Sequence, residues 1–272
     1  MVLLLLPLLL AAAPPCDPAV VRLAAPSAAQ GSVVPLEAAG PVRATWGGRP
    51  LPFWREGKEG PYRALLGVDL ERAPGAAAVE VAPAAGPACQ AALQVTAGAF
   101  PEKQLRVGER YVELSARDQA RARREAERLQ AVYARVSDRL WQGAFRLPVD
   151  VDPSPNFGQR RILNGQPRSP HAGVDFGARR GTPVVAPARG RVVLAEPLFF
   201  SGRTVILDHG LGLFSLYGHL STLSVKVGQR VETGTPLGAV GATGRATGPH
   251  LHWAVRLGGA RVDPLALVRG GE

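Results

Sequence analysis

Short apolar runs broken by turn residues characterise the chain from residue 16 to residue 98. Runs at 33–36, 43–46, 62–70 and 78–81 are separated by stretches rich in Gly and Pro. Turn signals about every 8–12 residues are typical of short antiparallel strands, so we expect a small β-sandwich here. Trp46, Phe53 and Trp54 could form a ligand platform, but packing in the core or between domains is the preferred interpretation.

A periodicity of 3.6 residues covers residues 115–142 and predicts a helix. The apolar stripe consists of Leu129, Val132, Tyr133, Val136 and Leu140. Ser115 is a suitable N-cap, Asp118 lies in the first turn, and no Gly or Pro interrupts the segment. We therefore expect a linker over 99–146 whose helix lies across the C-terminal domain.

From residue 147 to residue 272 the pattern changes to Val-rich runs between Gly and Pro turns. The expected strands are 182–186, 190–195, 204–208, 214–219, 225–227, 235–240 and 252–257. The predicted fold class is therefore mainly β. It comprises a small β-sandwich-like domain (16–98), one connecting α-helix and a compact antiparallel β-sheet domain (147–272).

The first 15 residues are expected to be a signal peptide with its h-region at 3–13. The run is uncharged and shorter than the ~20 residues of a membrane span, and Ala11-Ala12-Ala13 offers a cleavage site. A buried apolar helix is the alternative, because no basic residue precedes the run. We expect export to the periplasm or cell envelope, with no stable membrane span after processing. Lipid attachment at Cys16 is disfavoured, because Pro14 and Pro15 precede it.

Cys16 and Cys89 are the two cysteines of the chain. In an oxidising compartment they would form a structural disulfide, and the alternative is two unpaired thiols. Two cysteines are too few for a four-thiolate zinc site.

The net charge of the chain gives only weak information about the kind of molecule that the protein binds. The chain has a net charge of +10, and residues 151–272 hold 14 basic and seven acidic residues. This balance favours an anionic partner, such as a cell-wall polymer. A nucleic-acid partner is not expected, because residues 151–272 contain no basic helix, no aromatic residues interleaved with basic ones and no known binding module.

All five histidines lie after residue 170, in the C-terminal β domain. His250 and His252 are two positions apart, which places both rings on one face of a strand, about 6.6 Å apart at the Cα atoms. His171 and Asp175 would be about 13 Å apart in an extended chain, so we expect a bend at Gly173. Two His and one carboxylate form the ligand set of a catalytic zinc site.

Three motifs in this region resemble those of the lysostaphin-type (LytM-like) zinc metalloendopeptidases, which hydrolyse peptidoglycan. They are the HAGVD run that begins at His171, the YGHL run at 217–220 and the HLH run at 250–252. The resemblance covers about residues 157–264. It implies a β-sheet peptidase with one zinc ion per chain, acting on peptide bonds in the cross-links or stem peptides of peptidoglycan.

The same resemblance assigns roles to five residues. His171, Asp175 and His252 would be the zinc ligands, His250 the general base, and His219 a second catalytic histidine that orients water or stabilises the oxyanion. His209 occupies a position that is not a ligand and is interpreted as structural. We expect the protein to act as a monomer.

Two other classes of function remain as alternatives. Some relatives of these peptidases lack ligands and bind the wall or activate another murein hydrolase without catalysis, although every ligand position is occupied here. The run from Val225 to Gly238 also resembles biotinyl and lipoyl carriers. Carriers need a lysine at an exposed hairpin tip, and Lys226, the only lysine of the domain, lies within a strand-like run.

Overall fold

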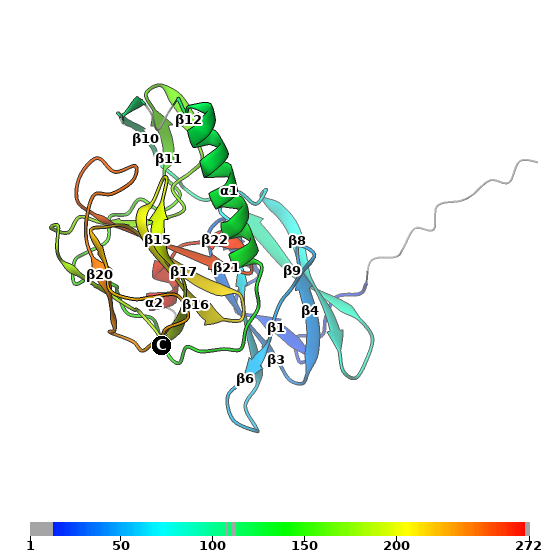
Figure 1. Ribbon diagram of the computed structural model, residues 1–272. Coiled ribbons are helices and arrows are strands. Elements are labelled where there is room, and N and C mark those ends of the chain that lie inside the picture. The colour runs from blue at the N-terminus through cyan, green and yellow to red at the C-terminus, as the bar shows by residue number, and fades with distance from the viewer. Residues whose placement is uncertain (1–12, 107, 110–112, 270–272) are drawn as a thin grey trace, which may run out of the picture.

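The computed structural model describes residues 13–106, 108–109 and 113–269 and has the mainly β architecture that the sequence predicts (Figure 1). The expected h-region at 3–13 lies almost entirely outside these residues. Among the described residues, no helix has the length and apolar composition needed to cross a membrane.

Two sheets form the N-terminal part of the chain and face each other as a sandwich. One holds β1 (Val21–Leu23), β3 (Val33–Ala38), β7 (Tyr62–Gly67) and β6 (Trp54–Arg55), in that order. The other holds β2 (Ser27–Ala29), β9 (Cys89–Thr96), β8 (Gly75–Pro83), β4 (Val42–Trp46) and β5 (Arg49–Pro50). Alternate residues of each strand point into a shared core, as Leu93 and Val95 do in β9.

A disulfide joins Cys16 to Cys89, with a Cα–Cα distance of 4.8 Å. Cys89 is buried among the apolar residues of the sandwich. Next to it, the backbone N–H of Gln90 donates a hydrogen bond to Pro14 O at 2.8 Å. The bond therefore fixes the start of the described chain against β9.

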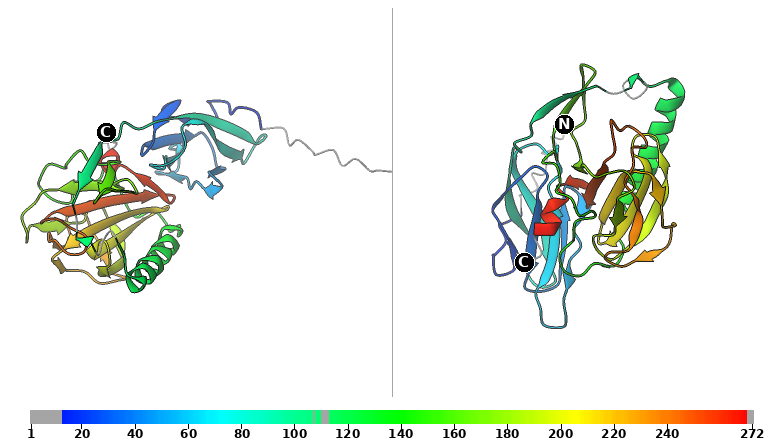
Figure 2. Two further views of the ribbon diagram at one scale, coloured as in Figure 1. Left: turned by 90° about the horizontal axis from the view of Figure 1, so that it is seen from above. Right: turned by 90° about the vertical axis from the view of Figure 1, so that its left-hand side faces the viewer.

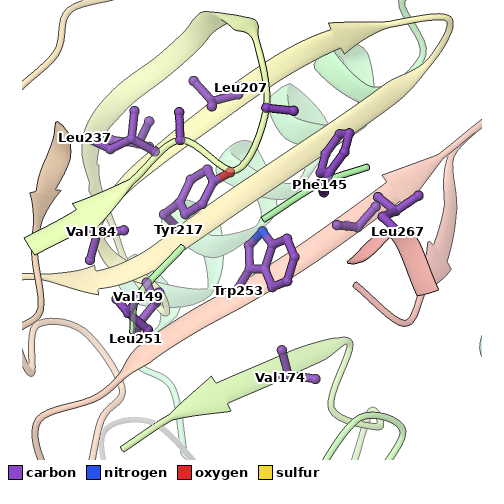
Figure 3. Packing of buried hydrophobic residues seen from close by; sticks show 14 of the residues in the cluster. Phe145, Val149, Val174, Val184, Leu207, Tyr217, Leu237, Leu251, Trp253 and Leu267 are labelled. Carbon is purple, nitrogen blue, oxygen red and sulfur yellow. The ribbon is translucent and has the colours of Figure 1, made fainter. Parts of the chain in front are cut away.

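A seven-stranded sheet dominates the C-terminal part. Its path is β13 (Gly173–Phe176), β21 (Leu251–Leu257), β17 (Leu213–Leu220), β16 (Gly202–Gly210), β15 (Gly190–Leu198) and β19 (Arg230–Val231), with β22 (Ala260–Val262) paired to β21. A smaller sheet holds β14 (Pro183–Val185), β20 (Pro236–Ala239) and β18 (Thr222–Leu223). Figure 3 shows Tyr217 and Trp253 at the centre of the apolar cluster, with Val184 and Leu237 of the smaller sheet on one side.

Helix α1 (Ala116–Tyr133) covers the other face of the large sheet. Ser115 caps it by accepting a hydrogen bond from the backbone of Asp118. Val132 packs with Ile206 and Phe214, which point away from the Tyr217 cluster. Figure 2 shows α1 and the N-terminal sandwich on opposite sides of the sheet.

The predicted helix over 115–142 is wrong at its C-terminal end, because α1 ends at Tyr133. The following residues bond to the end of β16 instead: Leu140 N donates to His209 O, and Leu211 N donates to Ser137 O, both at 2.8 Å. Gly210 permits this approach, since a Cβ there would lie 2.1 Å from Asp138 O. Val136, assigned to the apolar stripe, is consequently exposed.

The predicted strand at 225–227 is also wrong. Val227 is exposed, and Lys226 and Gly228 belong to a turn in which Gly228 has a φ of 89°. The turn belongs to the loop that connects the short strands β18 and β19, so residues 225–227 form no strand.

Four further elements complete the fold. β10 (Glu102–Leu105) pairs in parallel with β11 (Arg160–Leu163), which forms a hairpin with β12 (Gln166–Arg168). The last element is the short helix α2 (Leu265–Arg269). The β10–β12 group projects beyond the large sheet near the start of α1 (Figure 1).

Candidate metal centre and active site

Three predicted site residues converge at one point of the large sheet. His252 Nδ1 lies 2.9 Å from His171 Nε2 and 2.9 Å from Asp175 Oδ1. His171 Nε2 is 3.1 Å from the same carboxylate oxygen. Their ligand atoms all lie within 4.8 Å of one another, a spacing that allows all three to hold one metal ion.

Strand register explains this convergence. Asp175 in β13 is directly opposite His252 in β21, and His252 is opposite Gly218 in β17. Residues directly opposite in an antiparallel pair point to the same face. Their neighbours Val174 and Trp253 point into the apolar cluster, so Asp175 and His252 point to the opposite face of the sheet. Helix α1 covers another part of that same face.

Gly173 serves a different purpose from the expected bend. It is the first residue of β13, pairs with Ala254 and does not have a left-handed φ. A Cβ at this position would lie 2.4 Å from Trp253 O and 2.8 Å from His252 Cε1. Glycine is therefore needed for the close approach of β13 to the His252 ring, and His171 reaches the site from the segment before the strand.

His171 is held in one tautomer by its surroundings. Its Nδ1 lies 3.0 Å from the carbonyl oxygen of Asn156. A carbonyl can only accept, so Nδ1 carries the proton and Nε2 presents a lone pair toward Asp175 and His252. The side chain is buried. This is the arrangement that a histidine metal ligand needs.

The second oxygen of Asp175 is also occupied. Asn156 Nδ2 donates to Asp175 Oδ2 at 2.9 Å, and Arg161 Nη2 lies 3.4 Å from the same oxygen. Sequence reasoning missed both residues. Asn156 is 19 positions from Asp175, and no local spacing indicates that the two meet.

His250 and His219 lie beside this cluster. His250 Nε2 is 4.0 Å from Asp175 Oδ1, and the His219 and His250 ring centroids are 4.6 Å apart. The Nδ1 of each ring donates to a backbone carbonyl, of Gly248 for His250 (2.9 Å) and of Thr243 for His219 (2.8 Å). In its neutral form each ring therefore leaves Nε2 free of a proton, ready to accept one.

Burial and hydrogen bonding shape the charges of the site. Burial lowers the pKa of His171 to about 4 and that of His219 to about 3, so both rings are neutral near pH 7. Burial alone would raise the pKa of Asp175. Contacts with the His171 and His252 imidazoles outweigh burial and hold that pKa below its ordinary value. The result is a carboxylate facing the neutral imidazole of His171, which is the charge state in which these groups bind metal.

His209 is not part of this cluster among the described residues. It is fully buried, with Nδ1 2.8 Å from Arg189 O and Nε2 2.7 Å from Ser215 Oγ. Ser215 Oγ also lies 2.7 Å from the Tyr217 hydroxyl. Both ring nitrogens thus have partners in the core, as a structural role requires.

Comparison with known proteins agrees with this geometry. Residues 169–264 match the family described as Peptidase family M23. A crystal structure of a candidate M23 peptidase from Pseudomonas aeruginosa superposes with a TM-score of 0.72 at 37% identity, covering 88% of this chain and 94% of that one.

Curated relatives match over a shorter stretch. The peptidoglycan DD-endopeptidase ShyA of Vibrio cholerae is 38% identical over 136 residues, covering 49% of this chain and 32% of the relative. The murein hydrolase activator EnvC of Escherichia coli is 32% identical over 169 residues, covering 53% of this chain and 39% of the relative. The chain thus spans about a third of the length of these two proteins. Similarity to the Pseudomonas structure over nearly its whole length places the chain in peptidase family M23.

Proposed function

We propose that the protein is an exported, zinc-dependent endopeptidase that hydrolyses peptide bonds in the cross-links or stem peptides of peptidoglycan. The observation that carries the proposal is the meeting of His171, Asp175 and His252, with His250 and His219 beside them. The peptidoglycan substrate is suggested by relatives such as ShyA, a peptidoglycan DD-endopeptidase.

The donor set fits zinc in kind and in charge. Two imidazole nitrogens and one carboxylate oxygen are ligands that zinc accepts in catalytic sites. His171 Nε2 and His252 Nδ1 face each other at 2.9 Å, an arrangement in which two lone pairs would repel unless a cation or a proton lay between them. His171, Asp175 and His252 would hold one zinc ion, which would supply Lewis acidity to polarise a carbonyl and acidify water.

His250 is assigned the role of general base. Its Nδ1 proton is committed to Gly248 O, so its Nε2 can accept a proton from the attacking water and later return it to the leaving amine.

His219 is assigned a positioning role toward the same water. With Nδ1 donating to Thr243 O, its Nε2 accepts a hydrogen bond when the ring is neutral. If the ring gains a proton during the reaction, Nε2 can instead donate to the developing oxyanion. Loss of one such donor reduces rates by about 10²–10³.

Hydrolysis of purified cell wall by the wild-type protein and by one variant tests the proposal. The wild-type protein, loaded with zinc, should create new amino termini in purified sacculi and leave the glycan strands intact. His250→Ala should keep stoichiometric zinc but create them about 10²–10⁴ times more slowly. A wild-type protein that binds zinc yet creates no new amino termini would contradict the proposed activity.

A non-catalytic wall-binding or activating role is the second candidate. It is favoured by the similarity to EnvC, a murein hydrolase activator. In the same experiment this role predicts tight binding to sacculi with no new amino termini, and equal behaviour of wild type and His250→Ala.

Three further proposals concern cellular context. We propose that residues 1–15 direct export, because peptidoglycan lies outside the cytoplasm and residues 3–13 form an uncharged apolar run. We also propose that the protein acts in the periplasm or cell envelope. The chain is proposed to act as a monomer with one zinc ion, since all five site residues come from one chain.

A further inference from the structure

One asparagine contacts two of the proposed zinc ligands at the same time. Asn156 lies in the segment that runs along the outer edge of β13, where Ser154 N donates to Asp175 O at 2.8 Å. Its side chain reaches Asp175 and its backbone carbonyl reaches His171.

The side-chain amide fits Asp175 in one orientation. Asn156 Oδ1 accepts from the backbone N–H of Asp175 at 3.1 Å, and Asn156 Nδ2 donates to Asp175 Oδ2 at 2.9 Å. An N–H can only donate and a carboxylate can only accept, so this pair of bonds requires an amide with both groups. Neither aspartate nor alanine at this position could make both bonds.

The consequence for Asp175 is that its two oxygens have different tasks. Oδ2 is held by Asn156 with support from Arg161, whereas Oδ1 faces His171 and His252. A carboxylate held in this way presents one oxygen and cannot rotate to present the other. Arg161 Nη2 lies 3.4 Å from Oδ2, against 2.9 Å for Asn156 Nδ2, so Asn156 is the nearer of the two anchors.

The backbone of the same residue orients His171. Asn156 O accepts from His171 Nδ1, and the neighbouring Gly158 N donates to His171 O at 2.8 Å. His171 N in turn donates to Gln159 O at 2.9 Å. The segment that positions Asp175 therefore also fixes the ring and backbone of His171.

We infer that Asn156 is a positioning residue that sets the zinc affinity of the site, by holding Asp175 to one-oxygen ligation and His171 in its ligand tautomer. This inference rests on the proposed zinc-dependent function. Partners of this kind typically change metal affinity by about 10–100-fold. Only the side-chain part can be removed by mutation, since any residue retains the carbonyl that His171 uses.

The test compares the zinc affinity of three variants, measured by competition with a chelator at a temperature where each metal-free protein is folded. Asn156→Ala should weaken zinc binding about 10-fold, and Asn156→Asp about 100-fold, because it places a second carboxylate against Asp175. Asn164→Asp is the matched control. Asn164 is the only other asparagine, it is exposed in the β11–β12 turn, and its variant should bind zinc as the wild type does.

A second readout separates positioning from general stability. The visible absorption spectrum of the Co²⁺-substituted protein reports ligand geometry, and it should change in Asn156→Ala but not in Asn164→Asp. Wild-type affinity and spectrum in both Asn156 variants would overturn the inference while leaving the proposed function intact. If the wild-type protein itself binds no zinc, the proposed function fails and the inference with it.

Discussion

At the scale of single residues, the backbone of His219 shows how tightly the site is built. Its φ of 62° lies in the left-handed region, which residues other than glycine rarely adopt. Its N–H donates to Ser201 O at 2.6 Å and its ring to Thr243 O at 2.8 Å. The surrounding backbone thus imposes an unfavourable conformation, as is common at functional sites.

The glycine of the HAGVD run should be intolerant of any side chain. In Gly173→Ala the new Cβ would meet Trp253 O and the His252 ring, so β13 or the ring must move. We expect a loss of about 1–3 kcal/mol in the free energy of unfolding and weaker zinc binding. Thermal denaturation and chelator competition would measure both.

Gly177→Ala is the control for this substitution. Gly177 does not have a left-handed φ, and a Cβ there meets nothing within 4 Å. Stability and zinc affinity should stay close to wild type. Equal behaviour of the two variants would contradict the packing role of Gly173.

The same residues show what sequence can and cannot predict about the site. The even spacing of His250 and His252 follows from strand alternation, so their proximity could be predicted locally. The contacts of Asn156 and Arg161 with Asp175 depend on how a loop crosses the edge of a sheet, which no local pattern encodes. The sequence predicts a bend at Gly173, whereas the fold needs glycine there because Trp253 approaches closely. Trp253 is 80 positions away, and only the strand register brings it near.

At the scale of elements, helix α1 is connected to the site through the β15–β16 hairpin. Glu125 of α1 accepts from the backbone of Phe199 at 2.7 Å, at the hairpin tip. The tip in turn contacts the loop before His250: Arg245 N donates to Phe200 O at 2.8 Å, and its guanidinium lies 4.5 Å from the Phe200 ring. Gly202 and Gly244 make this backbone-to-backbone packing possible, since a Cβ at either would clash.

Loss of the helix contact should loosen the hairpin tip and the loop. In Glu125→Ala, Phe199 N loses its acceptor, so we expect faster amide hydrogen exchange at residues 199–202 and 243–245. Turnover should fall by less than about tenfold, because no catalytic group is removed. Exchange measured by mass spectrometry would show the change.

Glu127→Ala provides the comparison, as Glu127 is exposed on the same helix. It removes an equal charge without touching the hairpin. If exchange rises equally in both variants, or in neither, the connection from α1 to the loop is wrong.

The end of α1 illustrates why element boundaries are harder to predict than element types. The apolar periodicity continues through Val136 and Leu140, so the sequence favours a longer helix. Hydrogen bonds from the 137–140 segment to the end of β16 compete with helical ones and prevail. The end of β16 is some 70 positions further along the chain, as the hydrogen bond from Ser137 to Asp208 shows, so a local pattern cannot reveal this competition.

At the scale of the whole molecule, the N-terminal sandwich packs on the strand that carries His252. Gly67 of β7 lies against β21 and β22, where a Cβ would be 2.8 Å from Leu257 O. Asp69 forms an ion pair with Arg261 of β22, and the Arg261 backbone also donates to Asp69 Oδ2 at 2.9 Å. The two parts therefore share an interface that includes both backbone and charge.

The Asp69–Arg261 pair should contribute stability that depends on pH. Although burial opposes it, hydrogen bonding from Arg261 lowers the pKa of Asp69 to about 2 from an unfolded value of 3.8. A lowered carboxyl pKa stabilises the folded state above pH 3.8, and this contribution is lost as pH falls toward 2. Asp69→Asn should therefore lose about 1–3 kcal/mol near pH 7, with a smaller loss near pH 2.

Denaturant unfolding at several pH values would measure this difference. Asp150→Asn is the control, since Asp150 is exposed and outside the interface. A loss for Asp69→Asn that stays constant between pH 5 and pH 2 would contradict the ionic origin of the effect.

The register that places Asp175 opposite His252 also couples metal supply to folding. These two groups are 77 positions apart in the chain, so the unfolded protein has no comparable site. If zinc is the resident ion, each tenfold rise in free zinc above its dissociation constant adds about 1.4 kcal/mol to the free energy of unfolding. Resistance to heat and to proteolysis would then depend on the zinc content of the compartment, so that scarcity of the metal limits the lifetime of the enzyme as well as its activity.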